Sequence, residues 1–374
     1  MFREIKGQNA ALKALNTAID HDRISHAYLF HGIEGVGKFT AALYFGMALN
    51  CLSKSEFRPC GVCSSCRKFL ALDHPDLIYI FPSSNLKLSI DGEIQEAKGL
   101  REYKDYIRNK IETPWEDYHF SSNIMIRLES MRWLIKRLSI TKFEASQRIC
   151  IIEDADQMNI ETSNAFLKTL EEPPADTVII LTTNNLSSLL PTIVSRCQTI
   201  YFQPVTPQVI ETILMEKFNV SPHQARTASH IADGSVKRAI HLVQGESFEL
   251  RDRAFEIFRM AVQGGDLAYY NREYSPSAKP NAEKTIELLR YISLFAGDLN
   301  LVENAPEQVV NIDKLDFLLE TKARLGNIDE AALSDKILDF AYTMESYIRM
   351  INGNVNLQLI MLNLYPKLAH IFRV

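Results

Sequence analysis

The sequence lacks a long apolar run, an excess of positive charge and a low-complexity tract. Its apolar runs, such as Val178–Leu181, are far too short to span a bilayer, and the opening residues MFREIKGQ contain no apolar signal region. The net charge of −5 argues against a protein that coats nucleic acid by bulk charge, while a local basic face is compatible with it. We therefore expect a cytoplasmic protein with no membrane contact.

The first part of the chain has the pattern of an α/β fold. Its 374 residues predict two or three domains. Up to residue 204, apolar strands alternate with helical segments, and such strands are typical of a buried parallel sheet covered on both faces. The predicted strands are His26–His31, Asp76–Pro82, Arg148–Asp154, Thr177–Thr183 and Thr199–Gln203.

The rest of the chain has a helical pattern. Gln203-Pro204 marks the boundary, and three short helical segments near 207–218, 222–232 and 235–244 predict a small helical domain over 205–245. Apolar residues then recur at helical spacing, which predicts an all-α domain over 246–374. Within the α/β part, Ser83–Phe120 is polar and rich in both charge signs. We call this segment the insertion and expect a solvated surface excursion.

A phosphate-binding loop is predicted between the first strand and the next helix. Gly32, Gly35, Gly37 and Lys38 fit its pattern, in which backbone N–H groups surround phosphates and the lysine reaches the terminal ones. Phe39 occupies the position where a Ser or Thr hydroxyl would hold Mg²⁺. Thr40 comes one residue late, which turns it ~100° around the helix. The loop thus predicts the fold, and we favour a site that no longer hydrolyses ATP.

Two further strand ends complete this site. Glu153-Asp154 follows an apolar strand, where one acid would hold Mg²⁺ and the other would orient the attacking water. Their order reverses the common Asp-Glu order, which weakens the case for hydrolysis and leaves ATP and Mg²⁺ binding undecided. Thr183 and Asn184 end the fourth strand, where a polar group could sense a terminal phosphate, although polar residues are also ordinary at strand ends.

Four of the six cysteines are clustered. Cys51, Cys60, Cys63 and Cys66 supply four thiolates in a short window, which in a reducing compartment predicts a structural zinc site. Redox chemistry through Cys60-x-x-Cys63 is the alternative.

With these pieces placed, the chain resembles the delta-prime family of bacterial DNA polymerase III clamp-loader subunits, which are AAA+ proteins. The resemblance covers most of the chain and is looser in the helical C-terminal part. The motifs that carry it are Gly7-Gln8, His26-Ala27-Tyr28-Leu29-Phe30, the loop at 32–38, the four clustered cysteines, His74-Pro75-Asp76, Ala155-Asp156-Gln157-Met158-Asn159, Leu167-Lys168-Thr169-Leu170-Glu171-Glu172-Pro173-Pro174 and Ser195-Arg196-Cys197. The insertion is longer than this family leads us to expect.

The resemblance implies an AAA+ core over 1–204, a helical lid over 205–245 and a collar domain over 246–374. It implies a fixed partner of the gamma/tau and delta subunits in a hetero-oligomer that places a sliding clamp on primer-template DNA, as part of a polymerase holoenzyme. By motif, Arg196 is the arginine finger acting on a neighbour's ATP. Lys237, in Gly234-Ser235-Val236-Lys237-Arg238, occupies the second-sensor position where active motor subunits carry Arg.

Other interpretations stay open at this point. Arg132 and Lys136 share a helix face that lines the duplex in this family, but a solvated basic face is an equally good interpretation. The chain could also be an active ATPase motor of the gamma/tau type, or a zinc-dependent DNA-binding module.

Overall fold

The computed structural model describes residues 5–53, 58–89, 92–244, 247–265, 281–326, 329–352 and 356–372. Contacts divide the chain into two compact units, Met1–Ile210 with Asp233–Arg238 and Glu211–Ala232 with Ala239–Val374. The predicted boundary between 245 and 246 lies outside the described residues. The division of the helical part into two domains stays a prediction.

The first unit contains a five-stranded parallel sheet, and all five predicted strands are present. The strands are β1 (Ala27–His31), β2 (Leu77–Ile80), β3 (Arg148–Ile152), β4 (Thr177–Thr183) and β5 (Gln198–Tyr201). Their order in the sheet is β2-β3-β4-β1-β5, and every pairing is parallel. The predicted α/β class with a parallel sheet is therefore confirmed. The carboxyl ends of β1, β3 and β4 are neighbours, which brings their following residues together.

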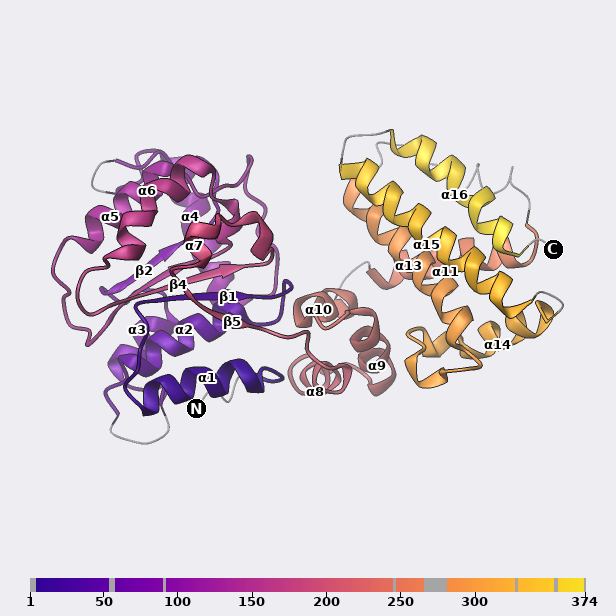
Figure 1. Ribbon diagram of the computed structural model, residues 1–374, viewed down its shortest axis with the longest axis horizontal. Helices are drawn as coiled ribbons and strands as arrows, with labels where there is room; N and C mark the ends of the chain where they lie inside the picture. The colour runs from indigo at the N-terminus through magenta and orange to yellow at the C-terminus, as the bar shows by residue number, and fades with distance from the viewer. Residues whose placement is uncertain are drawn as a thin grey trace. The chain divides into compact units, whose positions relative to one another are not determined.

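Helices cover both faces of this sheet (Figure 1). One side carries α1 (Asn9–Asp20), α2 (Lys38–Leu49) and α3 (Ser64–Leu70), and the other carries α5 (Leu128–Leu138), α6 (Ile160–Glu171) and α7 (Pro191–Val194). Side chains alternate between these layers, as strands require. Leu29 joins the core under α5 and α6, whereas Tyr28 meets the Phe45 ring of α2 at 5.2 Å between centroids.

The described part of the insertion contains a helix, α4 (Ala97–Glu112), and an antiparallel bridge between Ser83 and Met125 lies at its base. The expectation of a solvated excursion is wrong for the inner face of α4. The Tyr106 ring stacks on Phe81, just after β2, with 4.0 Å between centroids. Burial raises the pKa of Tyr106 well above its usual value. Aromatic residues therefore attach the insertion to the edge of the sheet.

The described part of the chain beyond β5 is helical, and the second unit contains most of it. The helices beyond β5 are α8 (Pro207–Phe218), α9 (Pro222–Ile231), α10 (Val236–Gln244), α11 (Ser247–Val262), α13 (Ala282–Leu301), α14 (Leu315–Arg324), α15 (Glu330–Asn352) and α16 (Leu357–Ile371). The Arg251 guanidinium is buried among them and pairs with Asp313 and Asn311. Among the described residues, no helix combines the length and apolarity needed to cross a membrane.

Candidate functional site

The glycine-rich loop has the backbone that the sequence predicts. Gly37 is the residue before α2 and has a φ of 93°, in the left-handed region that favours glycine. Gly35 lies directly against the start of α10, because a Cβ there would come within 2.3 Å of the Ser235 Oγ and 2.6 Å of the Lys237 Cβ. The Gly35 carbonyl accepts the Val236 N–H at 3.1 Å. The loop is therefore in close contact with residues 235–237.

Lys38 is buried and satisfied within the chain. Its ammonium donates to the carbonyls of Gly32 and Ile33, both at 2.8 Å, and to the Asn184 Oδ1 at 2.7 Å. These contacts use all three donors of a lysine. Burial lowers the Lys38 pKa to about 8, against the opposing effect of nearby carboxylates led by Asp154. A phosphate would have to replace these protein contacts to engage this side chain.

The two acids after β3 have different surroundings. Glu153 accepts a charged hydrogen bond from Lys110 at 2.6 Å and a hydroxyl hydrogen bond from Tyr106 at 3.2 Å, and Tyr79 also donates to it. Asp154 has a φ of 47° and accepts from the Asn184 Nδ2 at 3.1 Å. Burial, reinforced by the Glu153 and Asp156 carboxylates, raises the Asp154 pKa to about 7. The predicted acidic pair is thus engaged by internal partners.

The structure distinguishes the two polar residues that were predicted at the end of β4. Thr183 is fully buried, and its hydroxyl donates to Asp156 at 2.7 Å rather than turning toward Lys38. The next residue, Asn184, makes the contacts with both Lys38 and Asp154. Successive side chains at a strand end point in opposite directions, so of the two predicted residues Asn184 is the one that faces Lys38.

Lys237 reaches the same loop from the start of α10. Its ammonium pairs with Glu34 of the loop at 2.5 Å and also with Asp117 of the insertion. Burial works to lower the Lys237 pKa, and these two carboxylates outweigh it, so the pKa is raised. The structure therefore assembles the predicted nucleotide-site residues except Thr183, and it surrounds them with partners from the protein itself.

Arg196 lies outside this cluster and has solvent-exposed partners. Its Nε donates to the Glu171 Oε1 at 2.8 Å, and its Nη1 donates to the Thr192 carbonyl at 2.8 Å. The side chains of Arg196 and Glu171 are 33% and 47% exposed, so this pair is open to solvent. None of these partners belongs to the cluster around Lys38. Arg196 therefore presents a guanidinium that is accessible to another molecule.

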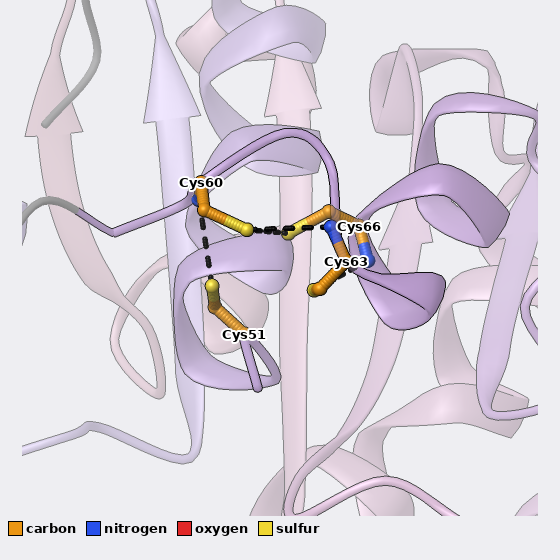
Figure 2. A group of neighbouring side chains, drawn as sticks. All are labelled: Cys51, Cys60, Cys63 and Cys66. Carbon is orange, nitrogen blue, oxygen red and sulfur yellow. Dashed lines mark hydrogen bonds between the residues drawn. The ribbon is translucent and has the colours of Figure 1, made fainter. Parts of the chain in front are cut away.

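The four clustered cysteines converge as predicted. Their Sγ atoms lie within 4.8 Å of one another and can hold a metal ion. Figure 2 shows the side chains around a common centre, with Cys51 and Cys60 before α3 and Cys63 and Cys66 at its start. Metal–sulfur bonds of about 2.3 Å place the sulfurs of a tetrahedral site ~3.8 Å apart, close to the 4.0 Å between Cys60 and Cys66.

Backbone amides support thiolates in this cluster. The N–H groups of Cys60, Cys63 and Cys66 each donate to the preceding cysteine sulfur of the cluster at 3.4 Å. Backbone donors, first of all that of Val62, lower the Cys60 pKa to about 6, whereas burial raises the pKa of Cys66. The donor set therefore fits a metal ion held by four thiolates.

The predicted basic face lies on α5. Arg132 and Lys136 are both exposed, one helical turn apart, while Met131, Leu134 and Leu138 on the opposite face are buried. The structure places the two side chains together on the surface.

Comparison with known proteins identifies the family of this chain. Residues 7–206 match the family model described as DNA polymerase III, delta subunit. The chain is 29% identical over 357 residues to DNA polymerase III subunit delta' of Bacillus subtilis, covering 94% of this chain and 93% of that protein. It is 29% identical over 247 residues to subunit tau of the same organism, covering 65% of this chain and 37% of that protein. A solved structure of a DNA polymerase III gamma subunit-related protein from Thermotoga maritima aligns with a TM-score of 0.43 and 16% identity, covering 97% of this chain and 100% of that one.

Proposed function

Because the chain belongs to the DNA polymerase III delta subunit family, we propose that it works in DNA replication as a clamp-loader subunit of the delta-prime type. Similarity to a delta' subunit along 93% of that protein's length supports this role. Its partners in this proposal are the gamma/tau and delta subunits, and through the complex a sliding clamp and primer-template DNA. The chain is then a component of a polymerase holoenzyme and contributes no ATPase activity of its own.

One contrast carries the mechanistic part of the proposal. Lys38, Glu153 and Lys237 are buried or half-buried and satisfied by groups of their own chain, while Arg196 is held by a solvent-exposed ion pair and one backbone carbonyl. A guanidinium that reaches a neighbouring subunit's ATP stabilises the charge that develops during phosphoryl transfer. We therefore assign Arg196 as an arginine finger acting in trans, on an AAA+ core over 1–204 that is followed by a lid over 205–245 and a collar over 246–374.

The cysteine cluster has a structural role in this proposal. Zinc is the metal that four thiolates in tetrahedral arrangement favour, and a site whose four ligands all come from the protein leaves no position for a substrate. We propose that Cys51, Cys60, Cys63 and Cys66 bind Zn²⁺ and thereby fix the connection between α2 and α3. Cys66 is fully buried, so the metal would lie at the edge of the hydrophobic core.

The isolated chain is expected to show no Mg-ATP turnover above background, because Phe39 replaces the metal-holding hydroxyl and Lys38 is already bonded. The measurement is a coupled ATPase assay on the purified full chain, with Lys38→Ala as the matched variant. Both proteins should give the same background rate and should co-purify with gamma/tau and delta subunits. Turnover by the wild type that disappears in Lys38→Ala would make the chain a motor of the gamma/tau type.

The basic face of α5 gives a separate prediction. If Arg132 and Lys136 contact phosphates, replacing both by Ala in the assembled complex should weaken primer-template binding about equally for all sequences. The slope of log affinity against log salt should fall by about one for each lost contact. An unchanged salt slope would assign these side chains to the solvated surface.

A further inference from the structure

The insertion contributes side chains to the predicted nucleotide site. Its helix α4 places Tyr103, Tyr106 and Lys110 at spacings of three and four residues, so they share one face. That face turns toward the sheet, because Phe81 lies within 6.0 Å of the Tyr103 ring and 4.0 Å of the Tyr106 ring, measured between centroids. The same face therefore carries Lys110 to the carboxyl end of β3.

Lys110 lies between the two residues that would flank a catalytic metal ion. Its ammonium is 2.6 Å from the Glu153 carboxylate and 4.3 Å from the centre of the Phe39 ring. Glu153 is the acid that would hold Mg²⁺, and Phe39 replaces the hydroxyl that would hold it from the other side. The side chains of Lys110 and Glu153 are only 14% and 12% exposed. A positive charge is therefore already present at Glu153, and the aromatic ring at 39 is a favourable neighbour for it.

Two tyrosines provide the other hydrogen bonds to Glu153. Lys110 donates to Oε1, and the hydroxyls of Tyr79 and Tyr106 both donate to Oε2. Each carboxylate oxygen thus has a partner. A metal ion at Glu153 would compete with these groups, and displacing Lys110 would leave its charge in a nearly buried position without its counter-ion.

The insertion supplies the opposite charge on another side of the loop. Asp117 pairs with Lys237, which also pairs with Glu34. Both carboxylates compete with a phosphate for this lysine, and Asp117 is the one that the insertion supplies. Asp117 thus provides part of the negative charge that a nucleotide would provide.

We propose that the insertion fills the nucleotide site of this chain with its own charges, Lys110 in place of Mg²⁺ at Glu153 and Asp117 in place of a phosphate at Lys237. The AAA+ core then holds its glycine-rich loop against residues 235–237 without any nucleotide. This inference rests on the proposed function only in taking the site as non-hydrolysing. It goes further in giving the insertion a role and in explaining the phenylalanine at position 39.

The test is nucleotide binding by the full-length chain, measured by isothermal titration with Mg-ADP. The variants are Lys110→Met, Asp117→Asn and the double variant. Lys104→Met is the matched control, since Lys104 is exposed on the same helix. Wild type and control should show no binding at millimolar ADP. The double variant should bind measurably, at least about tenfold more tightly than the limit that the wild type sets, because a hydrogen bond to a freed charged group is worth roughly that factor or more.

Three results separate the possibilities. If the double variant is folded and, like the control, does not bind Mg-ADP, the proposal is overturned. Tight Mg-ADP binding by the wild type would also overturn it, while leaving the clamp-loader role intact. If circular dichroism shows that the double variant is unfolded, Asp117→Asn alone decides, because its side chain is half exposed. That variant should gain ADP binding, and its failure to do so would again contradict the inference.

Discussion

Replacing Arg196 by Ala is expected to abolish most of the ATP turnover at the neighbouring site on which we propose that it acts, while assembly of the complex is unchanged. Arginine fingers accelerate phosphoryl transfer by about 10³-fold or more, because they neutralise charge that develops on the transferred group. The measurement is the DNA-stimulated ATPase rate of the reconstituted complex. Since other sites in the complex keep their own catalytic groups, the loss appears as removal of one site's share of the rate.

Two variants make this experiment specific. Arg196→Lys keeps the charge but loses the planar, bidentate geometry of the guanidinium, so it should restore little activity. Arg108→Ala removes an exposed arginine that also pairs with a carboxylate, Asp105, and should leave the rate unchanged. An Arg196→Ala complex with the full DNA-stimulated rate would rule out the finger role.

The pair between Arg196 and Glu171 bears on how the finger is presented. Both side chains are substantially exposed, and exposed ion pairs contribute only about 0–1 kcal/mol. Such a pair orients the guanidinium in the free chain and is weak enough to exchange for a neighbour's phosphate. Glu171→Gln should therefore leave the ATPase rate of the complex close to that of the wild type, in contrast to Arg196→Ala.

The centre of the sheet could be predicted from the sequence because β3 and β4 are buried on both faces. Val178–Leu181, for example, is buried throughout, so an uninterrupted apolar run between turn residues was a sufficient signal. The cysteine cluster could also be predicted from the sequence, since its four cysteines lie close together in the chain. In both cases the information is local.

The partners of the nucleotide-site residues lie far from them in the sequence and could not be predicted. Nothing near Glu153 in the sequence indicates that Lys110 would neutralise it, because that contact joins segments 43 residues apart. The signal that could have suggested it is the spacing of Tyr103, Tyr106 and Lys110, which gives a polar segment one aromatic face. The sequence also did not separate Thr183 from Asn184, because the direction of one side chain at a strand end decides which of them contacts Lys38.

Removal of the metal is expected to be the most damaging change to stability. Structural zinc contributes about 10–16 kcal/mol of apparent binding free energy in small thiolate sites, and that free energy is coupled to folding. Cys63 is the residue before α3, and Cys66 is buried in the first turn of that helix. Loss of the metal should therefore release α3 and, with it, the contact of Phe69 with His74, whose ring centroids are 4.5 Å apart.

Cys63→Ser should accordingly purify with little zinc and melt at a temperature at least several degrees below that of the wild type. Cys197→Ser is the control, because Cys197 lies outside the cluster and its loss should leave the zinc content unchanged. The measurements are zinc content by atomic absorption and thermal unfolding with and without a chelator. A chelator that removes the metal and abolishes DNA binding, yet leaves the melting temperature unchanged, would assign the cluster to nucleic-acid contact instead. The burial of Cys66 argues for the structural outcome, since a metal held by a fully buried ligand is tied to the core more directly than to a surface that meets DNA.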